Sequence, residues 1–181
     1  MPTYLLERLT APISRRDHRS GPLHAAAQLL EYGDFECPAC GAIHPLVQTI
    51  QKRLGQSLCF AFRNFPLTTV HPHSESAAEA AEAAAVQGEY WGMHNMLFEN
   101  QDALDYGDLA EYAAMLGLDS ARLTNEVVNR AHEGRVQGDF ASGIRSGVNG
   151  TPTFFINGAR YDGPRELESM VAALTQPPAW E

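Results

Sequence analysis

Two kinds of hydrophobic pattern alternate in the first third of the chain. Residues 24–35 are apolar in near-continuous succession and predict a buried strand. The apolar positions that follow recur at helical spacing until Gly55, and the aromatic-rich segment 57–65 then predicts a second strand, which ends before Pro66. A strand, a helix and a strand in this order indicate a βαβ unit, and therefore a parallel pair of strands.

The middle of the chain, residues 74–146, shows helical patterns alone. It opens with an alanine-rich run that ends at Gly88, in which Ser76 and Glu79 have the spacing of a capping box. Three further helices are expected. One covers residues 89–100, one ends at Gly117, and one begins at a cap formed by Asp119 or Ser120.

Strand patterns return at residues 151–161, where Asn157-Gly158 between apolar segments predicts a two-residue hairpin. A closing helix is expected with Pro164 at its first position. The order predicts an α/β protein in which a helical block interrupts a small mixed sheet. Its expected parts are an N-terminal arm (1–22), the first part of the sheet domain (23–70), an inserted helical domain (71–147), the second part of the sheet domain (148–176) and a tail (177–181).

Composition and charge narrow the possible partners. Of the 181 residues, 44% are hydrophobic and 19% charged, which is ordinary for a soluble globular protein. The formal net charge of −9 argues against nucleic acid and anionic membranes as partners. The short stretch "SRRDHRSG", which contains Asp17, is interpreted as a solvated arm. With no secretion signal or membrane span visible, we expect a cytoplasmic protein, in which a Cys-x-x-Cys is typical of catalysis or metal binding.

Cys37-Pro38-Ala39-Cys40 falls where the first strand gives way to the helix. With Cys37 at the N-cap and Pro38 at the first helical position, the free N–H groups of Ala39 and Cys40 point towards the Cys37 sulfur. These amides and the helix dipole favour the thiolate, so we expect a pKa for Cys37 of about 3.5–7.5. Cys40, one turn further on, is placed to resolve a mixed disulfide that Cys37 forms.

Glu31 lies six residues before Cys37, on the predicted strand. A buried Glu31 would have a raised pKa and could accept the proton of the resolving thiol near neutral pH. The alternative is an edge-strand glutamate that points into water, and the sequence leaves both interpretations open.

The remaining cysteine, the histidines and the apolar residues of segment 89–100 are interpreted as structural. Cys37, Cys40, His44 and Cys59 could together suggest zinc, but no second ligand pair exists, so we expect no metal. We interpret Cys59 as a buried inert thiol, with a third redox partner as the alternative. We interpret His44 as an exposed helix residue, with the alternative that it reaches the sulfur of Cys40, four residues before it on one helix face. We interpret His71 and His73 as turn and cap residues. The apolar residues of segment 89–100 are expected to pack in the core, namely Tyr90, Trp91, Met93, Met96 and Phe98.

The segments "LLEYGDFECPACG" and "GVNGTPTFFINGARYDG" resemble the thioredoxin superfamily, and more narrowly the DsbA-like thiol-disulfide oxidoreductases. The segments "RDHRSGP", "FRNFPL", "HPHS" and "MHNMLFENQ" are similar to a branch whose domains also occur fused to Na+/H+ antiporters. The resemblance covers roughly residues 15–176. It implies an α/β thioredoxin fold, a small mixed sheet flanked by helices, with an inserted all-helical domain.

The resemblance also implies roles for individual residues. Cys37 becomes the nucleophile, Cys40 the resolving cysteine and Glu31 the buried acid. Pro152 matches the cis-proline that faces the cysteine pair, and Thr151 would present its backbone to an extended substrate. We expect Pro38 and Ala39, which lie between the cysteines, to bind the substrate together with Thr151.

The function expected from these features is thiol-disulfide exchange without a cofactor, with a thiol- or disulfide-containing protein or peptide as substrate and a separate redox partner for recycling. A glutathione-dependent enzyme on the same fold and a non-enzymatic peptide-binding or chaperone module are the alternatives. The strongest oxidants of the DsbA type carry a histidine between the cysteines, where this chain has Pro38-Ala39. Because Asp34 and Glu36 also place negative charge nearby, we expect a milder oxidant or a reductase.

Overall fold

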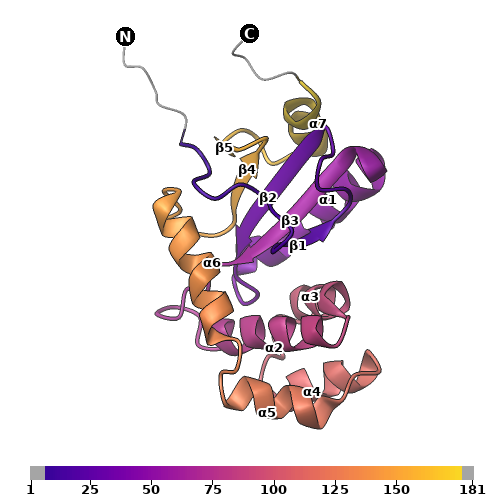
Figure 1. Cartoon of the computed structure of the whole chain (residues 1–181), viewed down its shortest axis with the longest axis vertical. Helices are drawn as coiled ribbons and strands as arrows, with labels where there is room; N and C mark the ends of the chain where they lie inside the picture. Colours follow the sequence, from indigo (N-terminus) through magenta and orange to yellow (C-terminus); the bar gives the residue numbers. More distant parts are fainter. Residues whose placement is uncertain (1–6, 177–181) are drawn as a thin grey trace.

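A five-stranded mixed sheet organises the fold (Figure 1), in a computed structural model that describes residues 7–176. The strand order is β1-β3-β2-β4-β5. The parallel pair of β2 and β3 confirms the predicted βαβ unit, and the other neighbouring strands are antiparallel. The strands are β1 (His18–Ser20), β2 (Ala27–Gly33), β3 (Leu58–Asn64), β4 (Thr153–Ile156) and β5 (Ala159–Tyr161).

The segment expected to be a solvated arm instead contributes to the sheet. Strand β1 pairs antiparallel with β3, with His18 opposite Phe62, and so covers an edge whose backbone groups would otherwise be unpaired. Asp17 accepts two hydrogen bonds from Arg63, at 2.7 and 3.1 Å, and both side chains are 5% exposed. The prediction of a solvated arm was wrong because Asp17, whose charge suggested an exposed segment, is buried as the ion-pair partner of Arg63.

Helices α1 (Pro38–Leu54) and α7 (Leu167–Thr175) cover one face of the sheet. Their buried side chains meet apolar residues that point to this face from the strands, including Leu29, Phe60, Phe62 and Phe154. Helix α7 begins three residues after Pro164, so the predicted start was wrong. The backbone at Glu166 is still extended, and the Pro164 carbonyl accepts a hydrogen bond from the Tyr161 hydroxyl.

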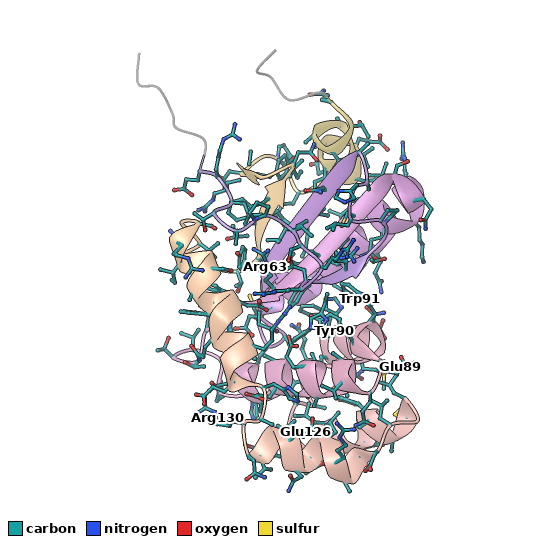
Figure 2. The ribbon with its side chains drawn as sticks, in the orientation of Figure 1. Arg63, Glu89, Tyr90, Trp91, Glu126 and Arg130 are labelled. Carbon is teal, nitrogen blue, oxygen red and sulfur yellow. The ribbon has the colours of Figure 1, made fainter. Side chains whose placement is uncertain are left out.

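The helical block lies beyond one end of the sheet in Figure 1. Helix α6, which the sequence patterns did not separate from its neighbours, returns along the second face of the sheet, where Phe140 stacks on Phe65 at 4.3 Å between ring centroids. Figure 2 shows Tyr90 and Trp91 between α3 and the sheet, where Trp91 lies against Phe60. The helices of the block are α2 (Ser74–Val86), α3 (Tyr90–Glu99), α4 (Tyr106–Met115), α5 (Ser120–Val128) and α6 (Glu133–Arg145).

The helix caps differ in part from the predictions. Ser76 and Glu79 do not form a capping box, because the Ser76 hydroxyl donates to the His73 carbonyl and the buried Glu79 carboxylate accepts the N–H of His132. The predicted cap of α5 is confirmed at Asp119, whose carboxylate accepts the N–H of Arg122.

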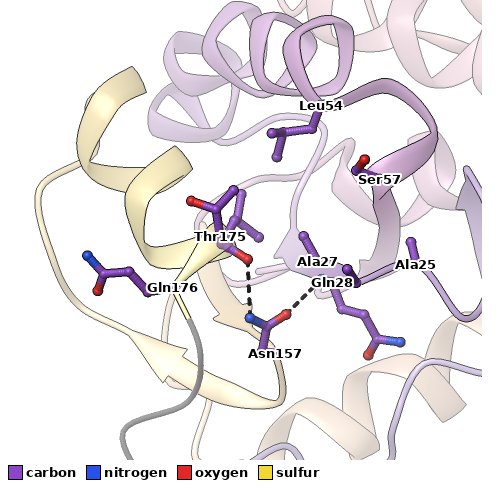
Figure 3. Close-up of a pocket in the computed structure, with 10 residues that line it drawn as sticks. Ala25, Ala27, Gln28, Leu54, Ser57, Asn157, Thr175 and Gln176 are labelled. Atoms are coloured by element: carbon purple, nitrogen blue, oxygen red, sulfur yellow. Dashed lines mark hydrogen bonds between the residues drawn. The ribbon is translucent and has the colours of Figure 1, made fainter.

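The hairpin of β4 and β5 is confirmed at Asn157-Gly158. Both residues have positive φ, 50° and 81°, as a tight two-residue hairpin turn requires. The Asn157 amide also joins two elements, since its oxygen accepts the N–H of Gln28 and its nitrogen donates to the Leu174 carbonyl (Figure 3). A cavity of about 570 Å³ opens beside these bonds, at the end of β2 that lies away from the cysteine pair.

Candidate redox site

The strand-to-helix joint places the two cysteines as the sequence predicts. Helix α1 begins at Pro38, with Cys37 as its N-cap and Cys40 within the first turn. Both cysteines are buried, but Cys37 keeps 6% of its surface exposed and Cys40 none, so Cys37 is the more accessible of the two. Pro38 and Ala39 are exposed beside it. All three cysteines, including Cys59, are free thiols.

Hydrogen bonding lowers the pKa of Cys37 to about 5. The largest cause is the bond from the Cys40 thiol, and burial opposes it. The Thr151 side chain and the N–H groups of Cys40 and Ala39 lower the pKa further. The helix amides that the sequence singled out therefore contribute, but the neighbouring thiol contributes more.

The pKa of Cys40 moves in the opposite direction. Burial raises it most, followed by the hydrogen bond to Cys37 and the negative charge of Glu31. Glu31 is itself 2% exposed, so the structure has the buried carboxyl and not the edge-strand glutamate. Burial raises the pKa of Glu31 to about 8, the charge of Arg165 lowers it, and that of Cys37 raises it. The buried Cys40 thiol therefore interacts with the carboxyl of Glu31, which titrates near pH 8, on the side of Cys37 that faces the protein interior.

The Thr151-Pro152 segment faces this pair. Its peptide bond is cis, and the Cys37 sulfur lies 3.5 Å from the Thr151 carbonyl oxygen, to which it donates a hydrogen bond when protonated. The two segments meet because β4, which follows Pro152, pairs antiparallel with β2, which precedes Cys37. Pro152 is buried, while Thr151 keeps partial exposure beside the sulfur.

The 34–37 loop, which joins β2 to α1, is bound to the start of the helical block. The Asp34 carboxylate accepts the N–H of Leu67 at 2.9 Å and pairs with the His71 ring at 2.8 Å. The Glu36 carboxylate pairs with the His73 ring at 2.9 Å and accepts its backbone N–H. The sequence placed the two histidines at a turn and a cap but gave no sign of these hydrogen-bonded pairs, in which the carboxylates raise the pKa of both histidines.

Gln101, from the segment after α3, also holds the 34–37 loop. Its side-chain nitrogen donates to the carbonyls of Phe35 and Cys37, at 2.9 and 2.8 Å. The side chain lies over the first turn of α1, where a methyl group at Gly41 would collide with it. Sequence reasoning missed Gln101 as a site residue, although it closes the segment "MHNMLFENQ" that carried part of the family resemblance.

His44 is not the exposed residue that was expected. It is 6% exposed and its ring packs against those of His94 and Phe98, at 5.4 and 5.0 Å between centroids, because α3 covers this side of α1. Cys59 is fully buried in β3, as predicted. Over residues 7–176, no three His, Cys, Asp or Glu side chains converge as metal ligands, and no helix is both long and apolar enough to cross a membrane.

Comparison with known proteins gives consistent results. Residues 14–176 match the family model described as thioredoxin. The Na(+)/H(+) antiporter NhaA 3 of Salinispora tropica is 45% identical over 159 residues, and NhaA 1 of Mycolicibacterium gilvum is 38% identical over 172 residues. These alignments cover 88% and 92% of this chain but 24% and 28% of the antiporters, so the chain spans about a quarter of their length.

Solved structures show the same fold at low sequence identity. Oxidised BdbD from Bacillus subtilis superposes with a TM-score of 0.83 and 20% identity, over 93% of this chain and 95% of that one. The α-DsbA1 protein of Wolbachia pipientis gives a TM-score of 0.75 at 20% identity, with 90% and 92% covered. The chain therefore shares its fold with these two proteins over nearly the whole of each chain.

The first prediction concerns the ionisation of Cys37. Iodoacetamide should alkylate Cys37 at a rate that rises with a midpoint near pH 5, because the pKa is lowered to about 5, while buried Cys40 and Cys59 stay unmodified. Mass spectrometry of the native protein, quenched at intervals between pH 3.5 and 9, measures this. A midpoint at the ordinary thiol value of about 8.5 would contradict it.

The second prediction concerns Gln101. The Gln101→Ala variant should speed hydrogen exchange of the amides in residues 34–41, because the two carbonyl bonds that hold the loop are lost, each worth about 1 kcal/mol. Gln87→Ala is the matched control, since Gln87 also makes two side-chain bonds to backbone, both to Asp119 in the helical block. Equal exchange of residues 34–41 in both variants would show that Gln101 has no special hold on the loop.

The third prediction concerns His71. Burial disfavours its charged form, but the hydrogen bond and charge of Asp34 outweigh this and raise its pKa. A raised folded-state pKa means that the stabilisation is fully present below the unfolded value of about 6.5 and is lost as pH rises through the folded value. Urea unfolding should therefore show a larger loss of stability for His71→Ala at pH 6 than at pH 9. The control is His24→Ala, which removes an exposed histidine, and an equal loss of stability for His71→Ala at pH 6 and pH 9 would contradict the prediction.

Proposed function

Because the chain belongs to the thioredoxin family, we propose that it is a thiol-disulfide oxidoreductase that works through the Cys37-Cys40 pair. The observation that carries the proposal is the opposite pKa shift of two adjacent thiols, one accessible and lowered to about 5, the other buried and raised. A peptide-binding module has no use for this difference, whereas dithiol exchange needs both thiols.

The first step is attack on a substrate disulfide. At neutral pH Cys37 is a thiolate, and its sulfur attacks one sulfur of the substrate. The new Cys37–substrate bond forms as the substrate disulfide breaks, and the second substrate sulfur leaves as a thiolate. The substrate backbone would lie along Thr151, whose carbonyl faces the attacking sulfur, with exposed Pro38 and Ala39 on the other side.

The second step is resolution by Cys40. Glu31 takes the proton of the Cys40 thiol, and the resulting thiolate attacks the Cys37 sulfur. The Cys37–Cys40 disulfide forms, the mixed disulfide breaks, and the remaining substrate sulfur is released. Two electrons have passed from the pair to the substrate. The reverse sequence oxidises a substrate dithiol, and in either direction a separate redox partner must restore the pair.

The direction of exchange follows from the potential of the pair. The expectation of a milder oxidant than a Cys-Pro-His-Cys enzyme rested partly on uncompensated charge at Asp34 and Glu36. Both carboxylates are hydrogen-bonded to histidines, and the missing histidine between the cysteines is what supports a milder potential. The cytoplasmic location stays a prediction from the sequence, tested by cell fractionation.

The fourth prediction tests the function through three matched substitutions. Insulin reduction with dithiothreitol should be lost in Cys37→Ser, because no accessible thiolate remains. Cys40→Ser should form a mixed disulfide that it cannot resolve and that gel electrophoresis without reductant detects. Cys59→Ser should retain wild-type activity, since this thiol lies buried in β3.

The same variants distinguish the alternatives. Full turnover by Cys40→Ser with glutathione as the reductant would favour a monothiol, glutathione-dependent reaction over dithiol exchange. Substrate binding that survives Cys37→Ser, with no insulin reduction by the wild-type protein, would favour a binding module. Equilibration of the pair with glutathione buffers gives its potential and hence its direction.

A further inference from the structure

We propose that Arg165 is a positioning residue for the proton transfer between Cys40 and Glu31, holding the Pro152 carbonyl and supplying positive charge to the buried Glu31 carboxyl. This role rests on the proposed oxidoreductase function. Neither the sequence patterns nor the family resemblance singled out Arg165.

The geometry places the guanidinium over the part of the sheet that contains Glu31. Arg165 precedes α7, and its Nη2 donates to the Pro152 carbonyl at 2.9 Å. Its Cζ lies 5.8 Å from the centroid of the Phe154 ring. Phe154 is opposite Glu31 in the antiparallel pair of β4 and β2, and opposite residues of such a pair project to the same face. One side chain therefore contacts the cis-proline segment and lies over the same face of the sheet as the buried acid.

Glu31 has few other sources of stabilisation. One of its carboxyl oxygens is buried without a hydrogen-bond partner in the structure. The titratable groups that interact with it are Cys37 and Cys40 at the start of α1, Tyr90 on α3, and Arg165. Cys37 as a thiolate opposes ionisation of Glu31, and Arg165 is the group among these four that favours it.

This charge matters because a base must be ionised in order to accept a proton. With a pKa near 8, Glu31 is ionised in a minor fraction of molecules at pH 7. Loss of the Arg165 charge raises the pKa further and reduces that fraction. Resolution by Cys40 should then slow, while attack by Cys37, whose pKa does not depend mainly on Arg165, should continue.

The test compares Arg165→Gln, Arg165→Lys and Arg53→Gln with the wild type. Arg53→Gln is the matched control, since it removes the same charge from the last turn of α1, where Arg53 pairs with Glu168. The pKa of Glu31 is measured by NMR of protein labelled with carboxyl-¹³C glutamate, with Glu31→Gln assigning the resonance. We expect a rise of about 1 in Arg165→Gln, a smaller rise in Arg165→Lys, and none in Arg53→Gln.

The kinetic arm uses oxidised glutathione to form the mixed disulfide at Cys37. Its resolution at pH 7 should slow in Arg165→Gln, by up to about tenfold, which is the limit that a rise of 1 in the pKa of Glu31 sets, while alkylation of Cys37 keeps its wild-type rate. An unchanged pKa of Glu31 in Arg165→Gln would overturn the proposal, as would equal slowing of alkylation and resolution. The NMR titration needs no activity: a shifted pKa in a protein that exchanges no disulfide would reject the proposed function and, with it, the positioning role, leaving an electrostatic contact alone.

Discussion

The hydrogen bond from the Cys40 thiol to the Cys37 sulfur is the interaction on which the rest of the site depends. Burial alone would raise the pKa of both thiols. This bond, with the amides that begin α1, makes the accessible sulfur the stable anion and leaves the proton on the buried one. The difference between nucleophile and resolving thiol is therefore a property of the pair, and it requires that Cys40 sit within the first helical turn.

The helical block acts on this pair through the 34–37 loop. His71 and His73 pair with Asp34 and Glu36, and Gln101 binds two carbonyls of the loop. These contacts fix the point at which β2 ends and α1 begins, and hence the direction in which the helix amides point. The two histidine rings also hydrogen-bond the carboxylates of Asp34 and Glu36, which raise the pKa of both rings. The block is thus part of the site as well as a neighbour of the sheet.

The features that the sequence predicted are those set by local pattern. The successive strand, helix and strand of the βαβ unit, the N-cap at Cys37 and the Asn157-Gly158 hairpin are each set by residues within one element or at its ends, and the parallel pairing of β2 with β3 follows from the order of these elements. What it missed depends on distant partners: β1 needs the free edge of β3, His71 meets Asp34 across 37 positions, and Gln101 reaches the Cys37 carbonyl across 64. His44 looked exposed because nothing near it in sequence shows that α3 covers α1.

The contacts that give Cys37 and Cys40 different pKa values in the resting protein disappear when Cys37 reacts with a substrate. Once Cys37 is bonded to a substrate sulfur, it carries no charge and accepts only a weaker hydrogen bond from the Cys40 thiol. Two of the causes that raise the pKa of Cys40, the hydrogen bond to Cys37 and its charge, are then removed, and so is the charge that raises the pKa of Glu31. The resolving thiol therefore becomes easier to ionise in the mixed disulfide than before it forms. A site built in this way keeps Cys40 protonated in the absence of substrate, and formation of the mixed disulfide then lowers the pKa of Cys40.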